Sequence, residues 1–253
     1  MSTTQPRPAA SGMYHPSRPR RLLKAAVYGL CFGIPVTALA FVVRQKFLPV
    51  IELDEAAIRA ATDFTRDHPA FFDALVVWQE MTQPKWPYIL ASLVCFWIWR
   101  QGRYKTRAMW AFVTMMVAWN LQLLLKELVQ RARPMVSDPV SHAPGYSFPS
   151  GHAANAAATA AVMVLLLWPM LSRRGRVVAV ILGTLYSVVT ALNRVYLGVH
   201  FPSDVTAGLI FGLGLAVASY TGYLGWNPVH PNADLPPEGA AGPEHAAAVK
   251  GKL

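Results

Sequence analysis

Hydrophobic residues gather into six long stretches of the chain, separated by shorter polar segments. These stretches cover residues 22–43, 87–99, 108–125, 153–171, 177–192 and 205–223. A transmembrane helix needs about 20 mostly apolar residues to cross the hydrocarbon core of a bilayer. Stretch 87–99 is the shortest, and it spans only if its helix extends backward or if Lys85 and Trp86 anchor it at the interface. The pattern predicts an all-α polytopic membrane protein with a bundle of six transmembrane helices.

Both ends of the chain lack the bulky apolar residues that a core requires. Residues 1–21 and 225–253 contain many prolines, and we expect them to be disordered tails. The membrane domain then covers residues 22–224. Residues 38–40 also fit a signal-peptidase site, so cleavage of the first stretch is an alternative. Because the apolar run continues beyond that site, we expect the first helix to be retained.

The long loop 44–85 carries apolar residues at nearly helical spacing in two runs. We therefore expect two short amphipathic helices in this loop. They fit two arrangements equally well: one lies on the membrane surface, and the other forms a cap packed on the helix bundle. The sequence leaves this choice open.

Charge alternates between successive loops. Residues 18–24, 100–107 and 173–176 contain four, four and three basic residues and no acidic one. Loop 44–85 instead contains five basic and seven acidic residues. Because Lys and Arg favour the cytoplasmic side, this predicts that both termini are cytoplasmic and that loops 44–86, 130–150 and 198–203 lie outside. We expect a multi-pass protein of the cytoplasmic (inner) membrane.

Composition agrees with this class of protein. Hydrophobic residues make up 54% of the chain and charged residues 14%, with a mean hydropathy of +0.31. Soluble domains carry about 25% charged residues, so an ordinary cytosolic enzyme, a coiled coil and a disordered protein are excluded. The net charge of +10 does not indicate nucleic-acid binding, because the basic residues divide between the inner loops and an outer cluster. Cys31 and Cys95 lie in apolar runs and form neither a disulfide framework nor a zinc site.

Ionisable residues collect where the apolar stretches end. They are Lys126, Arg131, Arg133, His152, Arg194, His200 and Asp204. Such residues are costly at membrane depth and therefore indicate function. By the predicted topology, all of these ends face outward. Lys, Arg and His suit a phosphate group, whereas a metal site would need a set of carboxylates, so we expect no metal ion and no cofactor.

The spacing of these residues supports a phosphate site. Lys126 and Arg133 are two helical turns apart and so share a helix face, and Pro134 ends that helix. Ser150 is a natural N-cap for the next apolar helix, and Gly151 lets a ligand approach the backbone. A helix N-terminus itself attracts anions.

Three ordered motifs then resemble a known family. Residues 126–134 read K-x6-R-P, and residues 149–152 read P-S-G-H. Residues 193–204 read N-R-x5-H-x3-D, in which Asn193 replaces the leading serine of the family pattern. The chain resembles the type 2 phosphatidic acid phosphatases, which are membrane lipid phosphatases related to vanadium haloperoxidases.

The resemblance implies three catalytic residues. His200 would be the nucleophile that forms a phosphohistidine, and Asp204 would hold the other ring nitrogen. His152 would protonate the leaving alkoxide and then activate water as a base.

The resemblance further implies a set of phosphate-binding groups. These are Lys126, Arg133, Ser150, Gly151 and Arg194. We expect three more residues at the edge of the site: Asn193, Arg131 and Tyr146. Of these, Arg131 fits an interfacial anchor or a supporting residue better than a phosphate ligand.

The expected function is metal-independent hydrolysis of a lipid phosphate or diphosphate at the outer membrane face, with the lipid bilayer and no nucleic acid as partner. Undecaprenyl diphosphate is the first expected substrate; phosphatidylglycerophosphate, phosphatidic acid and lipid A 1-phosphate are alternatives. A vanadate-dependent haloperoxidase would share the motifs, but six spans argue against that soluble class. A non-catalytic lipid-binding protein would not need His152, His200 and Asp204 intact.

Overall fold

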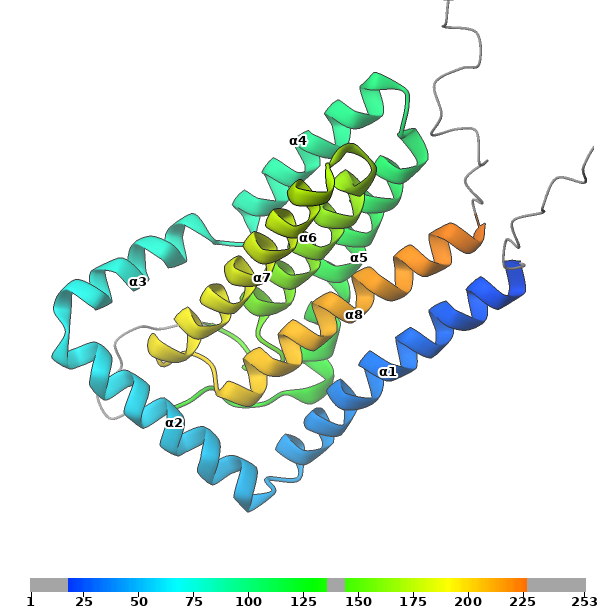
Figure 1. The fold of residues 1–253 in the computed structure, drawn as a ribbon. Coiled ribbons are helices and arrows are strands. Elements are labelled where there is room, and N and C mark those ends of the chain that lie inside the picture. Colours follow the sequence, from blue (N-terminus) through cyan, green and yellow to red (C-terminus); the bar gives the residue numbers. More distant parts are fainter. Residues whose placement is uncertain (1–17, 136–143, 227–253) are drawn as a thin grey trace, which may run out of the picture.

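The computed structural model describes residues 18–135 and 144–226, and helices make up most of both parts (Figure 1). The elements are α1 (Arg18–Arg44), α2 (Leu48–Asp67), α3 (Pro69–Met81), α4 (Lys85–Gln101), α5 (Lys105–Val129), α6 (Gly151–Leu167), the 3-10 turn η1 (Trp168–Met170), α7 (Arg173–Tyr196) and α8 (Pro202–Trp226). These two parts contain no strand. The predicted all-α fold is confirmed.

The helices extend beyond the apolar stretches that predicted them. α4 starts at Lys85 and ends before Gly102, which adopts a left-handed conformation with φ 87°. α1 begins at Arg18 and α8 ends at Trp226, inside the predicted tails 1–21 and 225–253. Each helix continues because its backbone groups need intrahelical partners until water or a cap can replace them. The remainder of both tails lies outside the described residues.

Five helices of the described residues are long and apolar enough to cross a membrane, namely α1, α5, α6 with η1, α7 and α8. α4 corresponds to the short predicted stretch 87–99 and has 17 residues, somewhat fewer than the roughly 20 that a span needs. It packs along α5 and also contacts α6. The chain is thus a multi-pass membrane protein.

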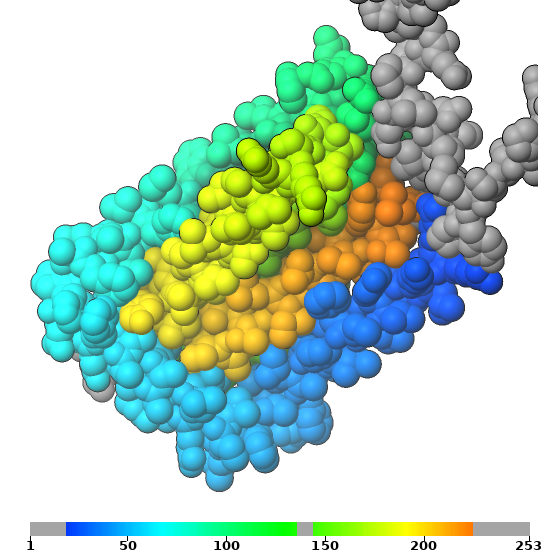
Figure 2. Space-filling view, in the orientation of Figure 1, coloured from blue at the N-terminus to red at the C-terminus, as the bar shows by residue number. Residues whose placement is uncertain are grey.

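α6 occupies the centre of the bundle, where it contacts α4, α5, α7 and α8. Its first half is rich in alanine, and such small side chains let neighbouring helices approach closely. α8 uses glycine for the same purpose: a Cβ placed on Gly212 would lie 2.2 Å from the carbonyl oxygen of Ala154. α1 runs along the other side of α8, as Figures 1 and 2 show.

The connections between helices alternate between the two ends of the bundle (Figure 1). At one end, named here the site end, α5 and α7 finish and α6 and α8 begin. The other end, named the basic end, holds the α4–α5 and α6–α7 connections, the start of α1 and the finish of α8. The three acid-free basic stretches of the sequence therefore meet at one end.

The loop 44–85 forms α2 and α3, which pack on α7 and α8 at the site end. α2 buries Ile58, Ala61 and Thr65, and the Thr65 hydroxyl donates a hydrogen bond of 2.9 Å to the carbonyl of Tyr196. Of the two arrangements that the sequence leaves open, the structure thus has the packed cap. The exposed residues of α2 are mixed: Leu53 is 68% exposed, and Glu55 and Arg59 are exposed as well.

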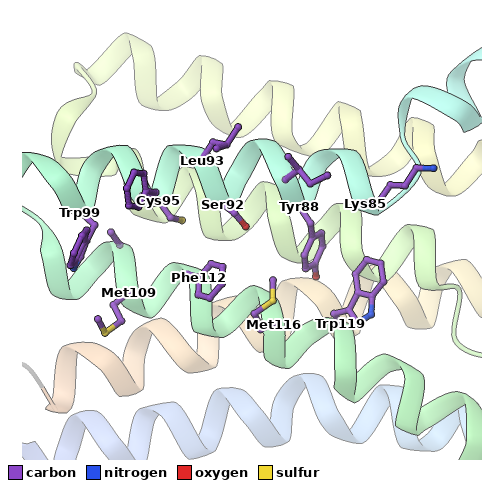
Figure 3. A pocket seen from close by; sticks show the side chains of 13 residues that line it. Lys85, Tyr88, Ser92, Leu93, Cys95, Trp99, Met109, Phe112, Met116 and Trp119 are labelled. Carbon is purple, nitrogen blue, oxygen red and sulfur yellow. The ribbon is translucent and has the colours of Figure 1, made fainter.

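An apolar hollow of about 740 Å³ lies between α4 and α5 on the outside of the bundle (Figure 3). Lys85 and Trp119 lie at one end of this α4–α5 hollow, and Trp99 and Met109 lie at the other. Lys85 begins α4, so the lysine end is the site end. A long apolar surface of this kind faces lipid in a membrane.

Candidate active site

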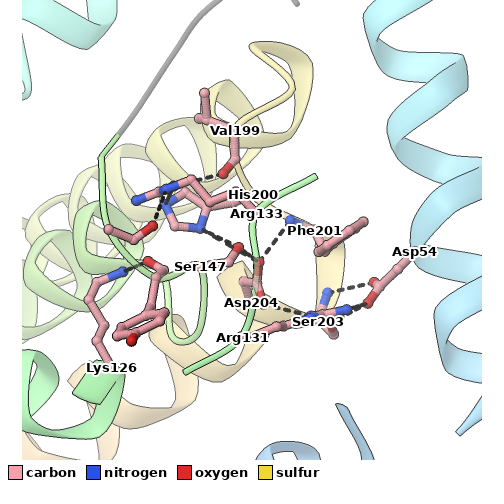
Figure 4. A network of polar contacts seen from close by, with 12 residues as sticks. Asp54, Lys126, Arg131, Arg133, Ser147, Val199, His200, Phe201, Ser203 and Asp204 are labelled. Carbon is pink, nitrogen blue, oxygen red and sulfur yellow. Dashed lines mark hydrogen bonds and ion pairs between the residues drawn. The ribbon is translucent and has the colours of Figure 1, made fainter. Parts of the chain in front are cut away.

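Four helix ends bring the predicted site residues together at the site end. Figure 4 shows part of this cluster, including Lys126, His200 and Asp204. Their positions are Lys126 in the last turn of α5, His152 in the first turn of α6, Arg194 in the last turn of α7, His200 in the α7–α8 connection and Asp204 in the first turn of α8. Arg133 follows α5 in the segment that leaves the bundle. His152 interacts electrostatically with Arg194, His200, Lys126 and Arg133, so these side chains form one cluster.

His200 is buried and has a partner at each ring nitrogen. Its Nδ1 lies 3.6 Å from Asp204 Oδ2, and its Nε2 lies 3.2 Å from Arg133 Nη1. Because a guanidinium can only donate, Nε2 must be the unprotonated acceptor. The proton then sits on Nδ1 and faces Asp204, which leaves the Nε2 lone pair on the side of the cations.

Burial lowers the pKa of His200 to about 4. The hydrogen bond and charge of Asp204 oppose this shift, whereas the charges of Lys126 and Arg133 add to it. The imidazole is therefore neutral at pH 7, as a nitrogen nucleophile requires. Burial also lowers the pKa of Arg133, and Asp204 again opposes the shift.

Asp204 is fully buried and accepts hydrogen bonds on both oxygens. Oδ2 accepts from the hydroxyl of Ser147 and, at 2.9 Å, from the backbone N–H of Phe201. Oδ1 accepts from Arg131 Nη1 at 2.6 Å. A buried carboxylate needs such partners to remain ionised, and here they also fix its orientation toward His200.

The three predicted phosphate-binding cations are held by oxygen atoms of the protein. Lys126 Nζ donates to the carbonyl of Tyr146 at 2.8 Å, and Arg194 donates to Gln79 Oε1 from α3. Arg133 donates to the carbonyls of Pro144, Gly145 and Val199 at 2.9, 3.0 and 2.8 Å. The bonds to the carbonyls of Pro144, Gly145 and Tyr146 attach the segment before the P-S-G-H motif to the site. Tyr146 contributes to this arrangement through its backbone.

Four polar atoms of the predicted site are buried without a hydrogen-bond partner among the residues that the structure describes. They are Ser150 Oγ, His152 Nε2, Asn193 Oδ1 and Arg194 Nε. Ser150 does occupy the N-cap position of α6, but its hydroxyl makes no capping bond, contrary to the sequence prediction. Its backbone N–H instead donates to the Asp204 carbonyl at 3.0 Å, which joins the starts of α6 and α8.

The site is closely packed around Gly151, where a Cβ would lie 3.0 Å from Gln122 Oε1. Within residues 18–135 and 144–226, there is no group of three or more His, Cys, Asp or Glu side chains that could hold a metal ion. The donor set consists mainly of cations and neutral hydrogen-bonding groups, which suits an oxyanion.

Two residues expected at the edge of the site have clear partners. Asn193 donates from Nδ2 to the carbonyl of Leu75 at 2.8 Å and thus ties α7 to α3. The side chain of Arg131 is 8% exposed and pairs with Asp54 and Asp204, which are contacts typical of a supporting residue.

Sequence reasoning missed Asp54, Ser147 and Gln79, which contact Arg131, Asp204 and Arg194. Asp54 carried a detectable signal, because it shares the buried face of α2 with Ile58. An acidic residue on the apolar face of an amphipathic helix needs a buried partner.

Comparison with known proteins agrees with the motifs. The model of the PAP2 superfamily matches residues 107–227. Phosphatidylglycerophosphatase B of Bacillus subtilis is 37% identical over 119 residues, which cover 44% of this chain and 58% of that protein. Decaprenylphosphoryl-5-phosphoribose phosphatase of Mycobacterium tuberculosis is 35% identical over 99 residues, which cover 38% of this chain and 50% of that protein. The chain thus spans little more than half the length of these curated relatives.

A solved structure extends the likeness beyond the motifs. The transmembrane PAP2-type phosphatidylglycerolphosphate phosphatase from Bacillus subtilis superposes with a TM-score of 0.63 and 26% sequence identity. The superposition covers 78% of this chain and 94% of that one. Together with the three motifs and the superfamily match, this shows that the chain belongs to the type 2 phosphatidic acid phosphatase (PAP2) family.

Proposed function

We propose that this protein hydrolyses a membrane lipid phosphate or diphosphate through a phosphohistidine intermediate. One observation carries the proposal: Ser150 Oγ, His152 Nε2 and Arg194 Nε are buried without partners among the described residues, in the cluster that holds the neutral imidazole of His200. Buried polar atoms of this kind are costly unless a ligand satisfies them. A phosphoryl group offers three acceptor oxygens to the donors and a leaving oxygen to His152.

The first step breaks one P–O bond and forms one P–N bond. The lone pair of His200 Nε2 attacks phosphorus, and the bond to the lipid oxygen breaks as His152 gives that oxygen a proton. Lys126, Arg133 and Arg194 hold the phosphoryl oxygens as negative charge shifts in the transition state. Arg133 turns from Nε2 to the phosphate, and Asp204 stabilises the proton on Nδ1 while the ring becomes positive.

The second step returns the enzyme to its starting state. Water attacks the phosphohistidine, the P–N bond breaks, and His152 accepts the proton of the water. The products are inorganic phosphate and a lipid alcohol, or a lipid monophosphate when the substrate is a diphosphate. Nothing in these steps needs a metal ion, because cations of the chain supply the positive charge.

The α4–α5 hollow favours a lipid substrate over a soluble phosphate ester. Its apolar lining suits an acyl or prenyl chain, and Lys85 at the site end suits the headgroup. Undecaprenyl diphosphate stays the first candidate, and phosphatidylglycerophosphate, for which the Bacillus relative is named, is the second. The site end would face outward from the inner membrane, with the basic end in the cytoplasm.

Phosphate release by the purified protein tests this proposal. The substrates are undecaprenyl diphosphate, phosphatidylglycerophosphate, phosphatidic acid and lipid A 1-phosphate, each with and without EDTA. We expect release from at least one lipid, unchanged by EDTA, and inhibition by vanadate, which mimics five-coordinate phosphorus. A short pulse of labelled substrate followed by denaturation should trap acid-labile label in the wild type and none in His200→Gln.

Three results would contradict the proposal. They are no release from any lipid, loss of activity in EDTA with recovery in magnesium, and acid-stable label on Ser150. A bromination assay with added vanadate tests the haloperoxidase alternative.

A further inference from the structure

Arg131 joins two buried carboxylates from different parts of the chain (Figure 4). Its Nη1 lies 2.6 Å from Asp204 Oδ1, and its Nη2 lies 2.7 Å from Asp54 Oδ2. The side chains are 8%, 0% and 3% exposed in the order Arg131, Asp204 and Asp54. Asp54 comes from the cap helix α2, about 150 residues before Asp204 in the chain.

Ser203 and Phe201 complete the surroundings of this ion triad. The backbone N–H of Ser203 donates to Asp54 Oδ1 at 3.0 Å, and its hydroxyl donates to Asp54 Oδ2. Arg131 Nη1 also donates to the Ser203 hydroxyl at 2.6 Å, and its guanidinium lies 4.2 Å from the centre of the Phe201 ring. The contacts fix the guanidinium plane.

The geometry decides which oxygen of Asp204 serves His200. A free guanidinium prefers to pair with both oxygens of one carboxylate. Here Asp54 takes Nη2, so only Nη1 reaches Asp204, and it reaches Oδ1. Oδ2 is left for Nδ1 of His200, together with Ser147 and the N–H of Phe201.

We propose that Asp54 is a positioning residue for the His200–Asp204 pair and acts through Arg131. It prevents Arg131 from pairing with both oxygens of Asp204 and so keeps Oδ2 directed at His200. The cap helix α2 thereby takes part in the catalytic step, although Asp54 contacts neither His200 nor the predicted phosphate-binding cations. This inference rests on the phosphatase proposed above.

The first test replaces the Asp54 carboxylate with an amide. We expect Asp54→Asn to lower kcat about 10- to 100-fold, the range that a small misplacement of a reacting group produces, and to leave KM unchanged. Asp63→Asn is the matched control, because Asp63 lies on the same helix, is 66% exposed and pairs with Arg66 at the surface. It should leave kcat unchanged.

Two inhibitors separate positioning of His200 from binding of phosphate. Vanadate bonds to the nucleophilic nitrogen, whereas inorganic phosphate only meets the cations and hydrogen-bond donors. In Asp54→Asn the inhibition constant for vanadate should rise by the same factor as kcat falls. The inhibition constant for phosphate should not change. If Asp54→Asn only reduced the folded fraction, kcat would fall while both inhibition constants stayed unchanged.

A double variant tests the route through Arg131. Arg131→Met leaves two buried carboxylates without their cation and should lower both the melting temperature and kcat more than Asp54→Asn does. Adding Asp54→Asn removes one of these charges, so the double variant should have a higher melting temperature and higher kcat than Arg131→Met alone. Independent roles would instead make the two losses in kcat multiply.

Each outcome supports or contradicts the inference. A wild-type protein that releases phosphate, with an Asp54→Asn variant of equal kcat, contradicts it and leaves the proposed function intact. A wild-type protein without activity contradicts the proposed function instead. If Asp54→Asn does not fold, Asp54→Glu decides: it keeps the charge but moves the carboxylate, and a kcat equal to that of the wild type would contradict the inference.

Discussion

The two histidines of the site differ in what surrounds their ring nitrogens. His200 has partners on both sides, from Asp204 and Arg133, whereas Nε2 of His152 is buried without one among the described residues. A nucleophile must be held in place before the substrate arrives, because misdirection costs rate. A proton donor can wait for its partner, since the leaving oxygen itself completes the bond.

This difference predicts different consequences for the two alanine variants. His152→Ala should lose about 10² to 10⁴ in kcat with a lipid phosphate, because acid assistance is gone. With p-nitrophenyl phosphate the loss in phosphoenzyme formation should be small, since p-nitrophenolate leaves without a proton. His200→Ala should show no such recovery with any substrate. Burst kinetics measure both cases, and equal losses for the two leaving groups would assign His152 another role.

The lowered pKa of His200 predicts a pH dependence of stability. Between pH 6.5 and about 4, the histidine of the unfolded chain binds a proton but the buried one does not. The unfolded state therefore gains stability as the pH falls, and the melting temperature should drop through this window. The melting temperature of His200→Gln should drop less over the same range. Melting curves in detergent at several pH values measure this difference. If the melting temperatures of wild type and His200→Gln fell in parallel, the pH dependence would not come from His200.

The sequence predicted those site residues that stand close together in motifs. His200 and Asp204 are four residues apart around one turn, so their proximity follows from local geometry. The prediction that Lys126 and Arg133 share a helix face was wrong, because α5 ends at Val129 and Arg133 lies beyond it. Asp54 reaches Arg131 only because α2 folds back on the bundle. Contacts of this kind depend on packing between distant segments, which periodicity does not describe.

Helices α6 and α8 form the element pair that places the site. Their closest approach runs along Gly208 and Gly212, at distances that a side chain could not occupy. His152 and Asp204 begin these two helices, so the spacing of the helices sets the spacing of the residues.

We predict that Gly212→Ala lowers kcat at least about tenfold and lowers the melting temperature, because the new Cβ would push α8 from α6. Gly33→Ala is the matched control on α1, where a Cβ meets nothing within 4 Å. It should keep full activity. The activity and melting temperature of both variants check this. A fully active Gly212→Ala would show that α6 and α8 can move apart without disturbing the site.

Element positions were predicted well in the membrane and less well outside it. Apolar length predicts a span directly. The amphipathic pattern of loop 44–85 did predict helices, but the same pattern serves a membrane surface and a protein surface. Only the burial of Ile58 and Ala61 against the bundle distinguishes the two.

At the scale of the whole molecule, the separation of basic loops predicts its orientation. In a background with both native cysteines replaced, Met135→Cys at the site end should react with an impermeant maleimide in intact cells. Gln101→Cys at the basic end should react only after the cells are opened. Both positions are exposed in the structure. Labelling of Gln101→Cys alone in intact cells would invert the topology and place the site in the cytoplasm.

The pairing of α1 with α8 also has a consequence for biogenesis. α1 ends at Arg44 and its main partner begins at Pro202, so at about 5–20 residues per second the ribosome needs about 10–30 s to supply that partner. During this interval α1 resides in the bilayer with only lipid against the surface that later receives α8. Among the described residues, the bundle is therefore completed by the helix that leaves the ribosome last, α8, which also carries Asp204. Assembly of the membrane domain and assembly of the His200–Asp204 pair end in the same event.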